Sequence, residues 1–240
     1  MKKKISIILC TYNEVNYVEF QIKLINKTLK NVEIIVVDDN SRDGTLDVLN
    51  RIKDVYSFKL IVRKNQRGLA SAQKVGFSIS SGDFIGTVDV NSKDQILYFP
   101  KLISKLESGF DMAFLSRYIL GGGDERIVIR SFASKLINIC SKKVLNIPYH
   151  DFTSGIFLMK RSLLNELNKI LTGYSEWFIE FVFNLHKQNI KIVEIPYFQT
   201  KDDKTIESKS YPNIIYFIYL GSKYFFRVLI IKLKSLFKFN

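Results

Sequence analysis

The chain has 240 residues, a length that suits one large domain with a sizeable buried core. Hydrophobic residues make up 47% of it, which excludes a disordered chain. Its 36 Lys and Arg outnumber its 23 Asp and Glu, giving a formal net charge of +13. Such an excess favours an anionic partner, namely nucleic acid, an acidic membrane surface or phosphorylated small molecules. A generally Lys-rich proteome would produce the same excess.

The cysteines and the first residues bear on the compartment. Cys10 and Cys140 lie far apart and show no metal-ligand spacing, a usage that suits a reducing cytosol. Lys2-Lys3-Lys4 is basic, but the apolar run 5–10 that follows is too short for a signal peptide. We therefore expect a cytoplasmic protein.

Short β-branched runs alternate along the chain with longer segments of helical period. The predicted strands are 5–9, 33–37, 58–62, 84–88, 112–115, 156–159 and 192–195. The predicted helices are 15–29, 45–52, 70–79, 97–106, 126–145 and 177–187. This alternation predicts an α/β fold with a doubly wound, mainly parallel sheet and helices on both faces. The order of the strands does not follow from the sequence.

The last part of the chain differs from the rest. Residues 201–210 are polar and predict a loop, so we divide the chain into a domain at 1–210 and a basic amphipathic segment at 211–240. The uncharged stretch 211–222 is shorter than the ~18–20 apolar residues that span a bilayer. At about 100° per residue, four basic residues fall on one stripe beside a broad apolar face: Lys223, Arg227, Lys234 and Lys238. The pattern predicts a helix lying in an anionic membrane interface; the alternative is a helix packed on the domain or in a dimer.

Polar clusters follow three of the predicted strands. They are Thr11-Tyr12-Asn13-Glu14, the run from Asp38 to Thr45, and Asp89-Val90-Asn91. Ligands of open α/β sheets bind beyond the carboxyl ends of strands. Converging carboxylates repel one another unless they meet a cation or accept hydrogen bonds, and ribose hydroxyls, a base N–H or a metal-bound diphosphate would satisfy them. Taken alone, Asp43-Gly44-Thr45 is equally well read as a turn and helix cap.

These clusters, with later ones, resemble the ordered landmarks of family 2 glycosyltransferases. The landmarks are Thr11-Tyr12-Asn13-Glu14, Val37-Asp38-Asp39-Asn40-Ser41, Asp43-Gly44-Thr45, Arg67-Gly68-Leu69-Ala70, Ser81-Gly82-Asp83 and Asp89-x-Asn91. Further blocks are similar to the polyprenyl-phosphate branch, typified by dolichyl-phosphate mannose synthase: Ser116-Arg117-Tyr118, Gly121-Gly122, Asp151-x-Thr153-Ser154-Gly155, Gly173-Tyr174, Glu180 and Ser208-Lys209. The resemblance covers about residues 5–210.

The resemblance implies a GT-A-like fold and an inverting transfer of a sugar, expected to be mannose from GDP-mannose, to a polyprenyl or dolichyl phosphate. It implies that the nucleotide sugar is bound by Tyr12, Glu14, Val37, Asp39, Asp89, Val90 and Asn91. Asp89 and Asn91 would hold Mg²⁺ or Mn²⁺, and Asp89 and Arg117 would be catalytic. Arg117, Arg130 and Lys209 would contact phosphates of donor or acceptor. The alternatives without a role in binding are a surface arginine for Arg117 and a solvated loop charge for Lys209.

The sequence departs from the family pattern at several points. Cys10 stands where the family usually has Pro, and the metal motif reads Asp-Val-Asn in place of Asp-x-Asp. Lys93 replaces a usual Gln; in a strand-like segment it would project to the same side as Asp89 and Asn91. Of the family's Arg-x-x-Gly-x-Ser-Lys loop only Ser208-Lys209 remains. We expect weaker metal binding as a result; the alternative is that the Lys93 ammonium takes over part of the metal's neutralising role. The histidines His150 and His186 have no partner at a useful spacing and receive no role.

An acceptor phosphate is already ionised and needs no strong general base, so the lack of a placed catalytic His or acid pair fits a lipid phosphate. The enzyme must then supply alignment and neutralise the leaving diphosphate. We expect it at the cytoplasmic face of a membrane as a peripheral protein. Two alternatives stay open: a family 2 transferase for another lipid or a surface polysaccharide, and a catalytically weak nucleotide-sugar-binding protein. Nucleic-acid binding is disfavoured because no recognition module is present.

Overall fold

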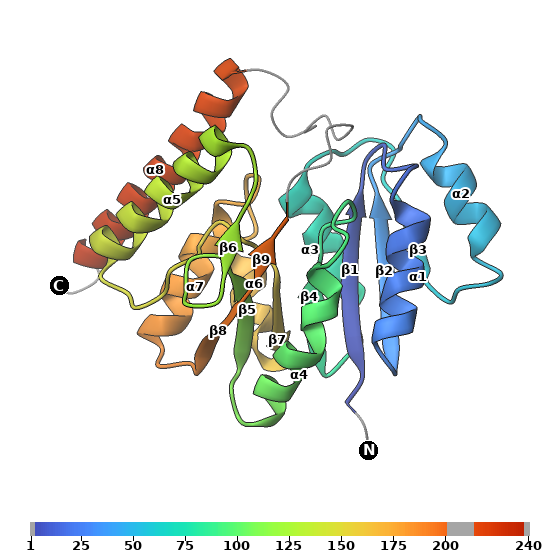
Figure 1. Ribbon diagram of the computed structural model, residues 1–240, viewed down its shortest axis with the longest axis horizontal. Helices are drawn as coiled ribbons and strands as arrows, with labels where there is room; N and C mark the ends of the chain where they lie inside the picture. Colours follow the sequence, from blue (N-terminus) through green and yellow to red (C-terminus); the bar gives the residue numbers. More distant parts are fainter. Residues whose placement is uncertain (1–2, 201–213, 238–240) are drawn as a thin grey trace. The chain divides into compact units, whose positions relative to one another are not determined.

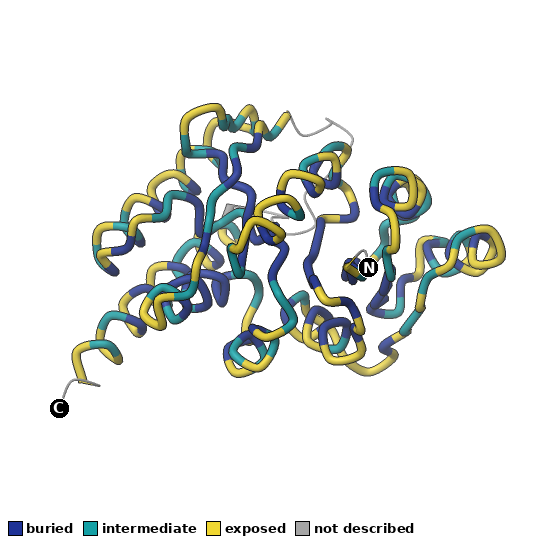
Figure 2. Tube along the Cα trace, turned by 90° about the horizontal axis from the view of Figure 1, so that it is seen from below, coloured by how far each residue is buried: buried dark blue, intermediate teal, exposed yellow. Residues whose placement is uncertain are grey.

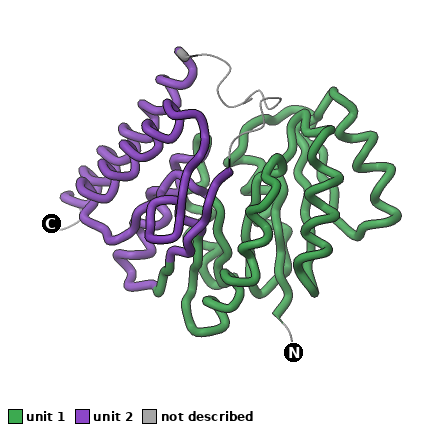
Figure 3. Tube along the Cα trace, viewed as in Figure 1, with its two compact units in different colours: residues 1–114, 156–174, 191–193 green, residues 115–155, 175–190, 194–240 purple. Residues whose placement is uncertain are grey.

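The computed structural model describes residues 3–200 and 214–237. The chain forms two compact units, coloured separately in Figure 3. Unit 1 comprises residues 1–114, 156–174 and 191–193, and unit 2 comprises 115–155, 175–190 and 194–240. The predicted loop 201–210, with Lys209 and the domain boundary at residue 210, lies outside the described residues.

A seven-stranded sheet runs through the molecule in the order β3-β2-β1-β4-β7-β5-β8 (Figure 1). Its strands are β1 (Ile5–Thr11), β2 (Val32–Asp38), β3 (Lys59–Val62), β4 (Phe84–Thr87), β5 (Met112–Ser116), β7 (Phe157–Lys160) and β8 (Ile192–Pro196). β1 pairs in parallel with β2 and β4, and β2 pairs in parallel with β3. β7 runs antiparallel to both β4 and β5. The mainly parallel, doubly wound sheet predicted from the alternation is therefore confirmed.

Helices cover both faces of the sheet in unit 1. They are α1 (Val18–Thr28), α2 (Thr45–Ile52), α3 (Leu69–Ile79), α4 (Phe99–Glu107) and α6 (Leu164–Ile170), with short 3-10 turns at Gln95–Tyr98 and Arg161–Leu163. Ile7, Ile8 and Leu9 are consecutive in β1 and all fully buried, which requires cover on both sides because their side chains alternate. Figure 2 colours the buried stretches of the chain dark blue. A Cβ added at Gly76 would lie 2.6 Å from the Ile8 side chain. Glycine at this position therefore lets α3 pack closely on β1.

Within the part of the chain that the structure describes, unit 2 contains three helices and a second, small sheet. The helices are α5 (Val128–Leu145), α7 (Trp177–Lys187) and α8 (Ile214–Phe237), and the sheet pairs β6 (Gly123–Asp124) in parallel with β9 (Phe198–Gln199). The predicted C-terminal helix is confirmed as α8. No helix within the described residues is long and apolar enough to cross a membrane.

Helix α8 is packed onto unit 2. It contacts α5 and α7 through a buried face made of Leu220, Tyr224, Val228 and Ile231. Arg227 is 2.8 Å from the Glu180 carboxylate of α7, and its side chain is only 18% exposed. The alternative of a helix packed on the domain therefore holds for this face. Arg227, one of the four basic residues of the predicted stripe, is therefore paired within unit 2, and the expectation that it meets an anionic membrane interface is wrong for this side chain.

Candidate donor site in unit 1 and acceptor pocket in unit 2

The loops that follow β1 and β2 in unit 1 are bonded to each other around Asp38. This buried carboxylate accepts hydrogen bonds from Thr11 Oγ1 at 2.7 Å, Ser41 N at 2.8 Å and Ser41 Oγ at 2.6 Å. Ser41 Oγ in turn accepts from Asn13 N at 2.8 Å, and Asn13 Oδ1 accepts from Arg42 N at 2.9 Å. Asp38 is fully buried and therefore shapes the strand-end loops from within.

Asp43 supports the turn before α2, so the turn in the alternative reading of its cluster is confirmed, but the N-cap position is Gly44 and α2 has no side-chain cap hydrogen bond. It accepts from Thr45 N at 3.0 Å as α2 begins, and from Val15 N at 3.1 Å. Burial would raise the pKa of Asp43, but the hydrogen bonds from Thr45 and Val15 outweigh it and hold that pKa below its usual range. Glu14 N donates to Thr45 Oγ1 at 2.8 Å. The backbone of Glu14 is thus fixed beside the start of α2.

Asp39 lies at the same edge, where it is paired with an arginine that the sequence interpretation missed. Arg63 Nε donates to Asp39 Oδ1 at 2.7 Å, and Gly68 N donates to Asp39 Oδ2 at 2.9 Å. Arg63 also donates to Ser71 Oγ at 2.9 Å and to Gly68 O at 3.2 Å. Asp39 and Arg63 are both buried. The pair therefore anchors the loop 64–68 to the end of β2.

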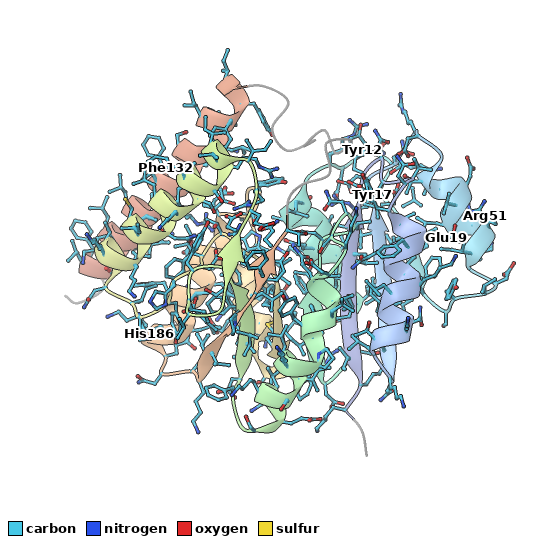
Figure 4. The ribbon with its side chains drawn as sticks, in the orientation of Figure 1. Tyr12, Tyr17, Glu19, Arg51, Phe132 and His186 are labelled. Carbon is cyan, nitrogen blue, oxygen red and sulfur yellow. The ribbon has the colours of Figure 1, made fainter. Side chains whose placement is uncertain are left out.

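Tyr12 is the ligand-accessible aromatic side chain of this edge. It is 37% exposed, and the Arg67 guanidinium carbon lies 4.6 Å from its ring centroid (Figure 4). A ring and a guanidinium plane of this kind are the groups on which a nucleobase stacks. Val37 differs, because its side chain is buried in a core cluster with Ile35 and Ala72. It offers no side-chain surface to a nucleoside.

The Asp-Val-Asn motif follows β4. Asp89 and Asn91 are exposed, while Val90 is buried. Gln95 makes two hydrogen bonds to Asp89: its Oε1 accepts from Asp89 N at 2.9 Å, and its Nε2 donates to Asp89 Oδ2 at 3.0 Å. The strand ends at Thr87, and 90–91 form a turn. The expectation that a strand-like backbone points 89, 91 and 93 to one side is therefore wrong.

The residues around Asp89 fit a divalent ion in part. Within the described residues, no group of three or more His, Cys, Asp and Glu is arranged to hold a metal. One exposed carboxylate and one exposed amide oxygen are nonetheless hard oxygen ligands of the kind that Mg²⁺ and Mn²⁺ take. Since Mg²⁺ normally keeps several waters and binds through one or two carboxylates plus substrate phosphates, this donor set suits an ion carried with a diphosphate.

In unit 2, Arg117 is the centre of a buried hydrogen-bonded cluster. Its Nε and Nη2 donate to the two oxygens of Asp151, both at 2.8 Å, and Nη2 also donates to Thr153 Oγ1 at 2.8 Å. Nη1 donates to Gln199 Oε1 at 3.1 Å. Burial would lower the pKa of Arg117, but the charge of Asp151 outweighs it and raises that pKa. The surface-arginine alternative is wrong, because Arg117 is 4% exposed.

A second carboxylate supports this cluster. Glu194 Oε1 accepts from the backbone N of His150 at 3.0 Å and of Asp151 at 3.1 Å, and its Oε2 lies 2.8 Å from His150 Nδ1. His150 therefore has a partner that sequence spacing did not reveal, because 44 residues separate the two. His186 makes an edge-on ring contact with Tyr149 at 5.7 Å.

A pocket of about 340 Å³ lies between α5 and α8 in the same unit. Its polar lining comes from Arg126, Arg130, Ser134, Thr153 and Ser222, and the rest from Ala133, Leu136, Ile137, Phe217, Ile218, Gly221, Tyr224 and Phe225. Arg126 is held by Asp124, with Nε–Oδ1 and Nη2–Oδ2 distances of 2.8 and 2.7 Å. Ser134 and Thr153 also contact Arg117. The structure thus brings Arg117 and Arg130 to one region, with Arg117 beneath the pocket wall and Arg130 lining the pocket.

Residues 6–167 match the family described as glycosyl transferase family 2. The match covers more than half of the chain, so the chain belongs to that family. Glucosyl-3-phosphoglycerate synthase from Mycobacterium tuberculosis has a similar fold, with a TM-score of 0.71 at 15% identity over 96% of this chain and 78% of the synthase. The GT-A-like fold expected from the sequence is confirmed.

Two curated relatives lie within the polyprenyl-phosphate branch. A dolichol-phosphate mannosyltransferase from Pyrococcus furiosus is 33% identical over 81% of this chain and 56% of its own length. An undecaprenyl-phosphate 4-deoxy-4-formamido-L-arabinose transferase from Pseudomonas fluorescens is 24% identical over 68% of this chain and 48% of its own length. The chain thus spans about half the length of these relatives. The predicted membership of the dolichyl-phosphate mannose synthase group is confirmed.

Proposed function

We propose that this chain is an inverting glycosyltransferase that moves a sugar from a nucleotide diphosphate sugar to a polyprenyl or dolichyl phosphate, with GDP-mannose as the donor. Its family membership supports the reaction class, and the names of the Pyrococcus and Pseudomonas relatives support a polyprenyl phosphate acceptor. The observation that carries the proposal is the α5–α8 pocket, which has arginines and hydroxyls beside apolar walls. An amphiphile with an anionic head and a hydrocarbon chain matches such a lining.

The donor is assigned to unit 1. Tyr12 offers its ring to the base, and the backbone around Glu14 and Val37 and the carboxylate of Asp39 border the ribose. The exposed Asp89 and Asn91 face the diphosphate, with buried Val90 fixing the turn between them. When bound there, Mg²⁺ or Mn²⁺ would neutralise charge on the leaving diphosphate. The synthase from Mycobacterium tuberculosis, whose fold this chain shares, was crystallised with Mn²⁺ and UDP.

The acceptor is assigned to unit 2. Arg130 lines the pocket and would contact the acceptor phosphate, together with Arg126, which Asp124 orients. Arg117 has its guanidinium nitrogens bonded within the protein, so we assign it the task of holding Thr153 and Ser134 in the pocket wall. Lys209, which lies outside the described residues, remains a predicted phosphate contact.

The reaction requires little acid–base catalysis from the protein. A phosphate monoester has a second pKa of about 6, so an acceptor oxygen is ionised at neutral pH. That oxygen forms the new bond to the anomeric carbon as the bond to the nucleoside diphosphate breaks on the opposite side, and the diphosphate leaves with the electron pair. No proton has to be removed. Alignment of the reactants and stabilisation of the leaving charge are then the main contributions of the enzyme.

A transfer assay tests the proposal. The full chain in detergent is incubated with a panel of nucleotide sugars and one of three acceptors: a polyprenyl phosphate, water-soluble 3-phosphoglycerate, or water alone. Products are identified by mass. We expect a hexosyl polyprenyl phosphate, formed best from GDP-mannose and lost on chelation. Arg130→Gln should reduce the yield far more than Lys143→Gln, a matched loss of charge on the same helix but outside the pocket.

The other outcomes decide between the alternatives. A product with 3-phosphoglycerate but none with the lipid would assign the chain a soluble acceptor. Transfer of a different sugar to the lipid would keep the reaction class and correct the donor. Nucleotide binding without turnover of any donor would favour the catalytically weak binding protein.

A further inference from the structure

A short hydrogen bond joins two hydroxyl groups in the wall of the α5–α8 pocket. Ser134 Oγ and Thr153 Oγ1 lie 2.6 Å apart, and the distance alone does not say which of them donates. Both residues line the pocket. A hydroxyl group has one hydrogen to donate and two lone pairs that accept. The other partners of each oxygen therefore decide the direction of this bond.

The amide of Asn138, on the buried face of α5, acts as a donor toward Thr153. Its Oδ1 accepts from the backbone N of Phe152 at 2.7 Å. Because a backbone N–H only donates, this contact fixes which end of the amide is the oxygen. The nitrogen Nδ2 is then the atom that lies 2.9 Å from Thr153 Oγ1. Asn138 is buried, so solvent does not offer its amide another partner.

Two obligate donors therefore meet the Thr153 oxygen. Arg117 Nη2 donates to it at 2.8 Å and Asn138 Nδ2 at 2.9 Å, and these two bonds occupy both lone pairs. The hydrogen of Thr153 has two acceptors nearby, Ser134 Oγ at 2.6 Å and Asp151 Oδ1 at 3.1 Å. That carboxylate oxygen already accepts from three nitrogen donors. The shorter contact, to Ser134, is the one that takes the hydrogen.

The hydrogen of Ser134 is then directed away from Thr153. One acceptor for it is the phenol oxygen of Tyr118, which itself donates to the Asp124 carboxylate at 3.0 Å. The other is any ligand oxygen in the pocket that Ser134 lines. A hydrogen bond to an ionised oxygen is roughly twice as strong as one between neutral groups, so an anionic ligand takes this hydrogen in preference to the phenol.

We propose that Asn138 and Thr153 are positioning residues, which order the hydroxyl pair so that Ser134 meets the acceptor as a hydrogen-bond donor. The inference rests on the proposed function, because the acceptor phosphate is the group that receives this hydrogen bond. The guanidinium groups of Arg126 and Arg130, which also line the pocket, have no lone pair and only donate. A fully ionised phosphate, whose terminal oxygens all accept, matches this set of donors.

The same ordering disfavours an acceptor that attacks through a hydroxyl group. Such an acceptor must give its proton to a base, and the described residues that line the pocket include no Asp, Glu or His. In the neighbouring cluster, Asp124 is bonded to Arg126 and Asp151 to Arg117. The direction of the hydroxyl pair thus favours a lipid phosphate over the sugar hydroxyl of a polysaccharide as the acceptor class.

The test compares the binding of a polyprenyl phosphate with that of the corresponding polyprenol, by titration calorimetry of the full chain in detergent without a donor. The two ligands share the hydrocarbon chain and differ in the headgroup. Thr153→Val keeps the shape of the side chain and removes its hydroxyl, whereas Thr153→Ser retains the hydroxyl. We expect Thr153→Val to weaken phosphate binding by about tenfold, the value of a hydrogen bond to a charged group, and to leave polyprenol binding unchanged. Thr153→Ser should bind both ligands as the unmodified chain does.

A double-mutant cycle shows whether Thr153 acts through Ser134. Ser134→Ala should weaken phosphate binding by about tenfold, and adding Thr153→Val should cause little further loss. Ser141→Ala removes another buried hydroxyl of α5, which donates to Ile137 O at 2.8 Å and lines no part of the pocket. This control should bind both ligands normally. Losses at Ser134 and Thr153 that multiply to about a hundredfold would mean that the two hydroxyls act independently, and would overturn the proposal.

Asn138→Asp tests the other positioning residue. It keeps an acceptor for Phe152 N but replaces the donor nitrogen by a second acceptor oxygen, which draws the hydrogen of Thr153 away from Ser134. Phosphate binding should fall as in Thr153→Val; if this variant does not fold, the cycle at Thr153 and Ser134 decides alone. Unchanged phosphate affinity in Thr153→Val, or an equal loss for phosphate and polyprenol, would overturn the proposal.

Binding is measured here without turnover, so the two proposals fail separately. Phosphate binding that depends on Thr153 in a chain that transfers no sugar would contradict the proposed function alone. Normal phosphate binding by Thr153→Val in a chain that does transfer sugar to the lipid would contradict this inference alone.

Discussion

The strand-end edge of unit 1 and the Arg117 cluster of unit 2 look alike in sequence but differ in the structure. Both place charged residues after strands. In unit 1 the buried carboxylates Asp38 and Asp39 support an exposed layer that includes Tyr12, Asp89 and Asn91. In unit 2 the charges of Arg117 and Asp151 are buried and satisfy each other, and the accessible surface is the mainly apolar α5–α8 pocket.

The two kinds of surface suit different ligands. An open polar edge with oxygen ligands and an aromatic face suits a water-soluble nucleotide carried with a metal ion. A pocket with arginines and hydroxyls beside aliphatic and aromatic walls suits an amphiphile. A charged residue at a strand end therefore does not by itself mark a ligand contact; its remaining exposure and the number of its internal partners decide that.

Breaking the buried Arg117–Asp151 pair of unit 2 should change the free energy of unfolding most. Asp151→Asn leaves Arg117 as a buried charge without its carboxylate, and removal of one partner of such a pair costs about 3–5 kcal/mol. The same chemical change at the exposed Asp89 should alter stability by less than about 0.5 kcal/mol. Urea unfolding, followed by the fluorescence of buried Trp177 in unit 2, measures both. If Asp151→Asn is as stable as Asp89→Asn, the two sites do not differ as described.

The next effect concerns Asp39 in the nucleoside region. Asp39→Ala should weaken donor and free nucleotide binding alike by roughly 1–3 kcal/mol, the value of hydrogen bonds to a charged group. Arg63→Gln distinguishes two routes to that loss. A much smaller loss in Arg63→Gln than in Asp39→Ala would place the carboxylate on the nucleotide, whereas equal losses would show that the pair acts by holding the loop 64–68. Titration calorimetry with the nucleoside diphosphate gives the affinities, and unchanged affinity in Asp39→Ala would remove Asp39 from the site.

A substitution in the Asp-Val-Asn motif should have a smaller effect, on the metal concentration that transfer requires. Asn91→Asp adds a carboxylate where an amide now stands, and ligand charge tunes the affinity of oxygen sites for divalent ions. We expect the metal concentration for half-maximal transfer to fall by roughly tenfold. A transfer rate that is insensitive to chelation in the unmodified chain would contradict the metal account. Lys93→Gln, assayed without metal, would then show whether a lysine supplies the positive charge.

The smallest effect is a pH dependence at the edge of the sheet opposite the donor site. Burial would raise the pKa of Glu33, but hydrogen bonds from Lys59, Ser6 and Ser81 outweigh it and hold that pKa well below the ordinary value of 4.5. A carboxylate with a lowered folded-state pKa stabilises the protein above its unfolded pKa, and this stabilisation is lost as pH falls through the folded value. Glu33→Gln should therefore cost about 1 kcal/mol at neutral pH and flatten the loss of stability below pH 4.5. If Glu33→Gln loses stability below pH 4.5 as steeply as the unmodified chain, Glu33 contributes nothing to the pH dependence of stability.

The sequence predicted the helices and strands of the large sheet well, because their periodicity is local. Helices α2 and α7 begin and end at the predicted residues. The antiparallel direction of β7 and the two-residue strands β6 and β9 were not predicted, since pairing between distant segments creates them. In the site, Arg63, Gln95 and Glu194 were missed because spacing along the chain does not show which side chain will meet a strand-end carboxylate or backbone. The pocket was missed because α5 and α8 meet only in the fold.

A substitution that fills the α5–α8 pocket shows whether the acceptor binds there. Gly221 lines the pocket, and a Cβ added there meets no atom within 4 Å, so the Cβ of Gly221→Leu is accommodated and removal of a glycine from the helix favours folding. The variant is compared with Ser235→Leu, on the same helix but outside the pocket. The account predicts that Gly221→Leu raises the KM for polyprenyl phosphate by about tenfold or more, because the new side chain occupies the acceptor's volume, while nucleotide affinity stays unchanged. A KM equal to that of Ser235→Leu would contradict it and remove the acceptor from the α5–α8 pocket.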